Sequence, residues 1–348
     1  MRVPLVYHDR PLFGFDLGTR TAKMIQLHPS GKHWQVSGYG YALFPPESIV
    51  EGIIVDPQEI VTALKPLMKQ MSYGHITAGR VAASLPVAKV FTRMLELPPM
   101  NTADLDAAIK LEAEQYIPVP LPDLYIDYDI IERQADQVQV LMVAAPRAIA
   151  DSYIKLFEML GLEVASLESS LSAVSRALVV GKPLSQVTLV ADIGSTAIDL
   201  TVHDRVIRLT DTVSLGGDNI TEQLVKDLGV SRDQANEIKY KFGLGPSGLQ
   251  PKVMASVGAP LQKMCTEMRR IIKYYQEKNG RKIEAILVSG GSASMPGFVE
   301  YLAAEISLPV SVADPWAGLE FKHVQPVSKL DAPMYTTAIG LARLEGKL

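Results

Sequence analysis

The sequence lacks several features that would assign a protein to a familiar class. It has one cysteine, Cys265, among 348 residues, so no internal disulfide can form and no cysteine zinc site can be built. Lysine and arginine number 34 against 38 acidic residues, and this net charge of −4 gives no basic footprint for nucleic acid. The six histidines show no i, i+4 pair and no other metal-ligand spacing. Nucleic-acid binding and a disulfide scaffold are therefore not expected.

Long hydrophobic runs are also missing. No stretch of 18 apolar residues occurs, and residues 1–12 have no apolar core of the length that a signal peptide needs. Apolar residues still make up 47% of the chain and charged residues 21%, enough for a substantial core. We therefore expect a compact cytoplasmic protein with two domains, or one large domain with insertions.

The predicted pattern of elements starts again near the middle of the chain. A strand at Leu12–Leu17 ends in Asp16, Leu17 and Gly18, and a strand at 186–193 ends in Asp192, Ile193 and Gly194, 176 residues later. A second strand follows each of these turns. Such a repeat predicts two lobes related by duplication, with a ligand cleft between them.

Periodicity predicts the remaining elements of the α/β fold. The predicted helices are 56–71, 101–116, 147–160, 169–180, 219–228, 233–241, 260–278, 298–305 and 335–344. The other predicted strands are 21–27, 34–43, 80–86, 87–97, 125–131, 138–144, 164–167, 196–203, 206–213, 283–288 and 308–312.

The two repeated turns have the chemistry of a phosphate and metal site. Glycine lets a turn bring its N–H groups close to an anion, and the following hydroxyl adds a donor. The carboxylates of Asp16 and Asp192 would hold a hydrated Mg²⁺, and Lys23 would add a positive charge. Each turn alone also occurs as an ordinary capped turn. The Gly216-Gly217 pair before a helix and the segment 289–292 after a strand are further phosphate- and ribose-compatible turns.

The order of these motifs resembles the actin-like ATPase superfamily. The segments are DLGTRTAK (16–23), DIGSTAIDL (192–200), LGGDNIT (215–221) and VSGGSASMPGF (288–298). The resemblance implies two ribonuclease H-like lobes that bind ATP with Mg²⁺, with Asp16 and Asp192 beside the metal. The residues implied at the nucleotide are Gly18, Thr19, Lys23, Gly194, Ser195, Thr196, Gly216, Gly217, Lys239, Gly290, Gly291 and Ser292.

The resemblance extends to two helices. In ASLESSLSAVSRAL (165–178), Glu168 stands where the superfamily has a residue that positions the attacking water; otherwise it is a carboxylate that a helix N-terminus favours. In ANEIK (235–239), Asn236 replaces the usual glutamate, which would alter nucleotide affinity. Asp199 matches a position where family members carry a non-catalytic aspartate.

Within the superfamily, the chain is most similar to PilM-like proteins and, after them, to FtsA. The segment LEAEQYIPVPLPDLYIDYDII (111–131) resembles their inserted subdomain, and its tyrosines could form that subdomain's core or the wall of a peptide groove. The implied domains are a first lobe at 1–184 with an insertion at about 80–145, and a second lobe at 185–348 with a helical subdomain at about 218–282 that covers the nucleotide.

The resemblance implies a scaffold of type IV pilus assembly. Its partner would be a PilN-like bitopic membrane protein, whose short cytoplasmic N-terminus binds in a groove beside the insertion. Pilus assembly ATPases and further copies of the chain are other candidate partners. The tail at 344–348 is too short to anchor, so the protein would reach the inner face of the cytoplasmic membrane through its partner. Nucleotide would set the lobe angle, with slow hydrolysis. The alternatives are an FtsA-like cell-division protein and a small-molecule kinase that uses Asp199 as its base.

Overall fold

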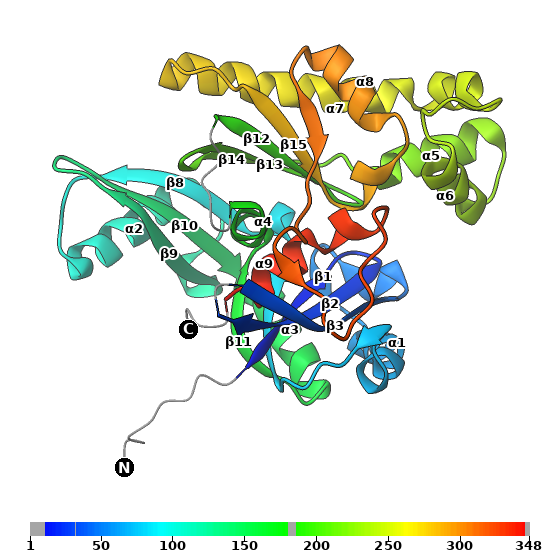
Figure 1. Ribbon diagram of the computed structural model, residues 1–348. Coiled ribbons are helices and arrows are strands. Elements are labelled where there is room, and N and C mark those ends of the chain that lie inside the picture. The colour runs from blue at the N-terminus through cyan, green and yellow to red at the C-terminus, as the bar shows by residue number, and fades with distance from the viewer. Residues whose placement is uncertain (1–10, 32, 180–185, 345–348) are drawn as a thin grey trace.

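The computed structural model describes residues 11–31, 33–179 and 186–344, which form two large sheets, one small three-stranded sheet and a two-stranded hairpin (Figure 1). The first large sheet has the order β11-β7-β1-β2-β3-β17, with β6 paired to β3. The second has the order β14-β13-β12-β15-β16. Strands of the first sheet are β1 (Leu12–Leu17), β2 (Thr21–Ser30), β3 (His33–Leu43), β6 (Tyr73–Gly74), β7 (Arg80–Leu85), β11 (Glu163–Ser169) and β17 (Leu319–Glu320). Strands of the second are β12 (Thr188–Ile193), β13 (Ile198–Asp204), β14 (Val206–Val213), β15 (Ala285–Ser289) and β16 (Val310–Val312).

The two large sheets repeat one topology. In the first, β1, β2 and β3 pair antiparallel in succession, while β7 and β11 add parallel strands on the other side of β1. In the second, β12, β13 and β14 are antiparallel, and β15 and β16 are parallel strands beside β12. The prediction of an α/β fold with two duplicated lobes is therefore confirmed.

The helices in the described part of the chain are α1 (Pro57–Lys69), α2 (Thr102–Tyr116), α3 (Arg147–Met159), α4 (Ser170–Val179), α5 (Gly217–Leu228), α6 (Arg232–Lys241), α7 (Gln250–Asn279), α8 (Phe298–Ile306) and α9 (Thr336–Ala342). Helices α1, α3, α4 and α9 cover the two faces of the first sheet. Helices α1 and α3 bury Ile60, Leu64 and Phe157 on one face of this sheet. Helices α4 and α9 pack on the opposite face, where Gly14 of β1 lies against the backbone of α9.

Helix α7 is longer than the sequence predicts. The sequence pattern predicts a start at Pro260. The helix instead begins at Gln250 and continues through Pro260. Val253, Val257 and Leu261 are buried at helical spacing, which extends the pattern toward the N-terminus. Their packing in the core of the second lobe offsets the loss of the helical hydrogen bond that Pro260 cannot donate.

The small sheet lies between β7 and α3 in the chain. It has the order β8-β10-β9, formed by β8 (Phe91–Leu97), β10 (Val138–Pro146) and β9 (Leu124–Arg133). Helix α2 buries Leu105 and Ile109 against it. Residues 80–85 belong to the first large sheet as β7, so the inserted sheet begins only at Phe91. Arg208 of β14 pairs with Glu132 at 3.0 Å and joins this insertion to the second lobe.

The last part of the chain returns to the first lobe. Strand β17 pairs with β3, and α9 packs against β1, although sequence places these residues in the second lobe. Tyr335 and Ile339 are buried in the cluster that also holds Ile25, Leu27 and Val36, which explains the return. In the described part of the chain, we find no helix with both the length and the apolarity for crossing a membrane.

Candidate functional site

The two repeated loops meet between the lobes. The β1–β2 loop and the β12–β13 loop have the same tight turn: Gly18 donates its N–H to Thr21 O and Gly194 donates to Ala197 O, each at 2.9 Å. Thr19 Oγ1 and Ser195 Oγ are 2.6 Å apart, although 176 residues separate them in the chain. The structure thus brings the two predicted phosphate loops into direct contact.

The two aspartates beside these loops have equivalent partners. Ser84, at the end of β7, donates from Oγ to Asp16 Oδ1 at 3.0 Å. Ser289, at the end of β15, donates from Oγ to Asp192 Oδ1 at 2.7 Å. Because β7 and β15 occupy equivalent places in the two sheets, duplication has produced the same Asp–Ser pair twice. The sequence prediction did not select Ser84, which only strand pairing brings to Asp16.

Lys23 lies beside the first of these aspartates. Its Nζ is 2.8 Å from Asp16 Oδ2, and the exposed fractions of the two side chains are only 12% and 15%. Lys23 and Asp16 are directly opposite on β2 and β1, whose pairing sets this contact. The lysine is therefore held at the loop where the sequence predicts a phosphate ligand, with its charge facing a carboxylate.

Asp199 occupies the junction of the lobes. It lies on β13, directly opposite Asp192 of β12. Its carboxylate accepts hydrogen bonds from Thr212 Oγ1 of β14 at 2.9 Å and from Ser170 Oγ of α4 at 3.1 Å. Burial, followed by the nearby charge of Asp192, raises the pKa of Asp199 to about 7. Burial likewise raises the pKa of Asp192 to about 6. Sequence reasoning gave Asp199 no binding role, and only the fold shows that it links the two lobes.

These raised pKa values predict that stability depends on pH. The folded protein keeps the Asp199 proton up to pH values near 7, whereas an unfolded aspartate loses it near 3.8, so the free energy of unfolding falls as pH rises between these values. Asp199→Asn removes this contribution. We expect the free energy of unfolding of the variant, taken relative to that of wild type, to rise by about 2 kcal/mol from pH 5 to pH 8. Urea unfolding at both pH values measures this difference, and a stability difference that does not change with pH would contradict the assignment.

Glycines pack the start of α5 against the second loop. A Cβ at Gly216 would lie 2.5 Å from the carbonyl carbon of Ser195, and one at Gly217 would lie 2.5 Å from Lys239 Nζ. The Gly217 N–H donates to Gly194 O at 2.9 Å. At position 216 only glycine permits this approach of one backbone segment to another, and it places the N-terminus of α5 beside the loop.

The last predicted motif joins the same cluster. Gly290 has a φ of +83°, and a Cβ there would lie 2.7 Å from the carbonyl carbon of Ile193. Lys239 of α6, only 2% exposed, donates to Gly217 O at 2.9 Å, and burial lowers its pKa to about 8. Gly291 and Ser292 continue from Gly290 in a short 3₁₀ turn. The structure therefore gathers Gly216, Gly217, Lys239 and Gly290 around the β12–β13 loop, the second predicted phosphate loop.

Two other residues have partners that the sequence did not predict. Arg20 of the first loop reaches across to Asp218 at 3.3 Å, and Arg232 pairs with the same carboxylate at 2.8 Å. Asn236 accepts a hydrogen bond from Thr221 Oγ1 at 3.0 Å. Arg20 thus links the two lobes at the edge of the site.

Glu168 lies on a strand that continues the predicted strand 164–167, whereas the resemblance to the superfamily implies a connecting helix for 165–178. Strand β11 pairs with β7 through Ser169, so the helix starts only at Ser170. Both Glu168 carboxylate oxygens accept from Arg176 at 2.7 Å, and Arg176 also donates to Gly340 O at 2.7 Å. The water-positioning role of Glu168 stays a prediction, while its observed contact is an ion pair with α4.

The residues at the two loops fit a magnesium nucleotide. Mg²⁺ typically takes one or two carboxylates and completes its shell with water and phosphate oxygens. Asp16 and Asp192 supply two carboxylates, and residues 11–31, 33–179 and 186–344 contain no cluster of three acidic, histidine or cysteine side chains that would hold a metal alone. The glycine turns and the N-terminus of α5 lie beside these carboxylates, and the N–H groups of Gly18, Gly194, Gly217 and Asp218 donate to backbone carbonyls of the same segments.

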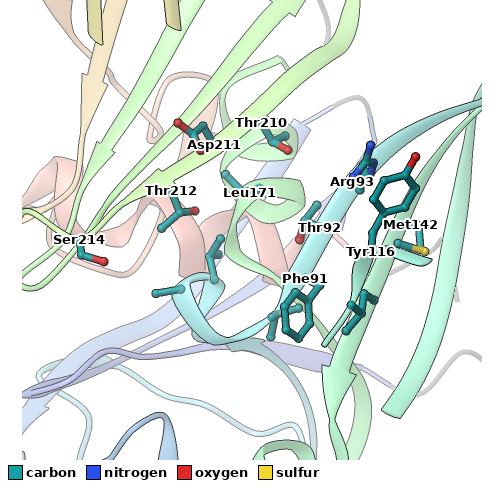
Figure 2. A pocket seen from close by; sticks show the side chains of 14 residues that line it. Phe91, Thr92, Arg93, Tyr116, Met142, Leu171, Thr210, Asp211, Thr212 and Ser214 are labelled. Atoms are coloured by element: carbon teal, nitrogen blue, oxygen red, sulfur yellow. The ribbon is translucent and has the colours of Figure 1, made fainter. Parts of the chain in front are cut away.

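A cavity of about 410 Å³ lies beside the inserted sheet. Figure 2 shows Phe91, Thr92 and Arg93 of β8 on one side of it and Thr210, Thr212 and Ser214 on the other. Strands β8 and β14 are both at the ends of their sheet orders. Because an edge strand has free backbone N–H and C=O groups, this cavity is bordered by two such edges. Leu171 of α4 and Tyr116 of α2 complete its lining.

Two duplicated sheets whose first loops meet between the lobes define the fold of actin-like ATPases. The chain belongs to the family of the type IV pilus assembly protein PilM, whose family model matches residues 14–346. This confirms the resemblance on which the sequence analysis rests.

Individual proteins are similar to this chain in sequence or in fold. The cell division protein FtsA of Neisseria meningitidis serogroup B is 27% identical over 190 residues, which cover 46% of this chain and 44% of FtsA. The chain thus aligns with about half the length of that relative. A solved PilM–PilN type IV pilus biogenesis complex is similar with a TM-score of 0.85 and 20% identity, covering 97% of this chain and 98% of that chain. MreB5 of Spiroplasma citri bound to AMPPNP has a TM-score of 0.57 and 13% identity, covering 98% of this chain and 97% of that chain. The two structures show the fold.

Proposed function

We propose that the protein is a nucleotide-binding scaffold of type IV pilus assembly. It binds ATP with Mg²⁺ between the lobes and the cytoplasmic N-terminal tail of a PilN-like membrane protein in the cavity beside the inserted sheet. The observation that carries the proposal is the meeting of the two loops, where Thr19 Oγ1 and Ser195 Oγ lie 2.6 Å apart and each residue follows an aspartate, Asp16 or Asp192, by three positions. Membership in the PilM family and the likeness to a PilM–PilN complex support the partner.

The nucleotide would bind through both lobes. Gly18, Thr19 and Lys23 from the first lobe, and Gly194, Ser195 and Thr196 from the second, would contact its phosphates. Since Thr19 and Ser195 touch, the lobes must separate to admit the phosphates. Lys23 would then exchange Asp16 for a phosphate oxygen, which frees the carboxylate for the metal's water shell. Bound Mg²⁺ would neutralise charge on the phosphates and on the two aspartates.

The second lobe would hold the nucleoside. Gly216 and Gly217 place the N-terminus of α5 beside the second loop, and Gly290, Gly291 and Ser292 would let a ribose or a flat base lie against their backbone. Lys239 is buried next to both segments and donates to Gly217 O. Its amino group would exchange Gly217 O for an oxygen of the nucleotide.

The cavity beside the inserted sheet suits an extended tail. A peptide that enters between β8 and β14 would hydrogen-bond to either free strand edge, and the cavity would take one of its side chains. Arg93, whose guanidinium carbon lies 3.6 Å from the centre of the Tyr116 ring, borders the same cavity. Through this tail the protein would be held at the inner face of the cytoplasmic membrane.

Ser214→Trp tests this assignment, because Ser214 is an exposed cavity residue whose enlarged side chain fills the space. We expect a synthetic peptide that copies the tail of the PilN-like protein to bind wild type and to lose about tenfold or more in affinity to the variant, measured by calorimetric titration. Ser311→Trp is the matched control, since Ser311 is exposed on β16 at the opposite edge of the same sheet. Equal affinity for both variants would place the tail elsewhere.

A further inference from the structure

Asp199 lies between the nucleotide loops and the cavity. On β13 it is directly opposite Asp192, which the proposed function assigns to the metal. On its other side it is directly opposite Thr212 of β14, a residue that lines the cavity. One polar row therefore crosses the second sheet from Ser289 through Asp192 and Asp199 to Thr212, and it joins the two proposed sites.

The same carboxylate also reaches the first lobe. Ser170 Oγ, at the start of α4, donates to Asp199 Oδ2 at 3.1 Å, and Thr212 Oγ1 donates to Asp199 Oδ1 at 2.9 Å. The residue after Ser170 is Leu171, whose side chain lines the cavity (Figure 2). Asp199 thus holds together two cavity walls, one from each lobe.

We propose that Asp199, through Ser170 and Thr212, couples occupancy of the interlobe cleft to the width of the cavity. This inference rests on the proposed function, because it concerns how the two sites communicate. When the lobes separate to admit nucleotide, α4 moves relative to β13 and β14, and the Ser170 bond to Asp199 breaks or shifts. Leu171 then changes its distance from Thr212, which alters the space that the tail enters. Asp199 is a positioning residue in this scheme.

The test compares tail affinity with and without nucleotide. Calorimetric titrations measure the dissociation constant of the tail peptide in the absence and presence of saturating Mg²⁺ and a non-hydrolysable ATP analogue. For wild type we expect the two constants to differ about fivefold or more, the lower range of usual allosteric coupling. Ser170→Ala and Thr212→Val each remove one hydroxyl from Asp199, and we expect both to reduce the ratio to less than about twofold.

Thr210→Val is the matched control for Thr212→Val. Thr210 lies two residues earlier on the same strand, points to the same side and also lines the cavity, but its hydroxyl is not one of the two that donate to Asp199. If Thr210→Val changes the affinity for the tail, we expect the same change with and without nucleotide. The ratio of the two dissociation constants then stays at the wild-type value. A merely structural role of Ser170 and Thr212 would lower stability without changing this ratio.

The outcomes separate this inference from the proposed function. If wild type binds both tail and nucleotide, but the tail dissociation constant is the same with and without nucleotide, the coupling is wrong and the two proposed sites remain supported. Ser170→Ala and Thr212→Val that keep the wild-type ratio overturn the role of Asp199. Wild type that binds neither tail nor nucleotide overturns the proposed function itself, and the coupling with it.

Discussion

Asp16→Asn is expected to weaken Mg-nucleotide binding by about 100-fold or more. The substitution keeps the shape of the side chain and the acceptor for Ser84, but it removes the charge that would face the metal's water shell. In the loaded site the partner of the Asp16 carboxylate would be the hydrated metal, because Lys23 would then face a phosphate oxygen. Removing one member of such a buried charge pair costs about 2–5 kcal/mol, which corresponds to a loss of that size.

Calorimetric titration with Mg-ATP measures the effect of Asp16→Asn, with circular dichroism to establish that the variant is folded. Asp136→Asn is the matched control, because Asp136 is exposed in the turn between β9 and β10, far from the loops in sequence. We expect this control to bind as wild type does. If Asp16→Asn and Asp136→Asn bind nucleotide equally, the metal assignment of Asp16 is wrong.

Gly340→Ala is expected to lower the free energy of unfolding by about 3 kcal/mol. A Cβ at Gly340 of α9 would lie 2.5 Å from the carbonyl carbon of Ala173 in α4 and closer still to its oxygen. Both partners are helix backbone, so neither can move aside as a flexible side chain would. The two helices must separate, and α9 would also lose its fit against Gly14 of β1.

Urea unfolding measures this loss, and Gly258→Ala is its control. Gly258 lies inside α7, where a Cβ would meet no other atom within 4 Å. Alanine there removes the entropic disadvantage of glycine in a helix, so we expect a gain of about 0.5–1 kcal/mol. A Gly340→Ala variant as stable as wild type would contradict the close packing of α4 and α9.

The site was predictable where it depends on local pattern. Asp16 and Asp192 each follow an apolar strand and precede a glycine turn, so sequence places both at strand ends. Duplication then implies that the two turns face each other, which the contact between Thr19 and Ser195 confirms. The α/β class followed from the same repeat, because equal strand patterns recur at both ends of the chain.

Contacts between distant segments could not be predicted in the same way. Ser84 reaches Asp16 only through the parallel pairing of β1 with β7, and Thr212 reaches Asp199 through a strand register that periodicity does not specify. The short hairpin of β4 (Ile49–Val50) and β5 (Ile53–Ile54) was also missed, since strands of two residues have no period to detect. Its turn is formed by Glu51 and Gly52, both with positive φ.

Glu168 shows how strand pairing decides a position that the local prediction left between a strand at 164–167 and a helix at 169–180. Its surroundings, with Leu167 before it and Leu171 after it, suit a helix as well as a strand. Pairing of β11 with β7 selects the strand as far as Ser169. The Arg176 side chain then holds the Glu168 carboxylate against α4, a contact that the helical interpretation does not contain.

The account is tested most directly by one calorimetric titration, in which the peptide copying the PilN-like tail is added to the protein with and without Mg-ATP. We expect the peptide to bind in both states, with an affinity that shifts when nucleotide is present. That result would support a nucleotide-responsive scaffold of pilus assembly. No binding in either state would contradict it, and a small-molecule kinase with Asp199 as its base would then be the function to test.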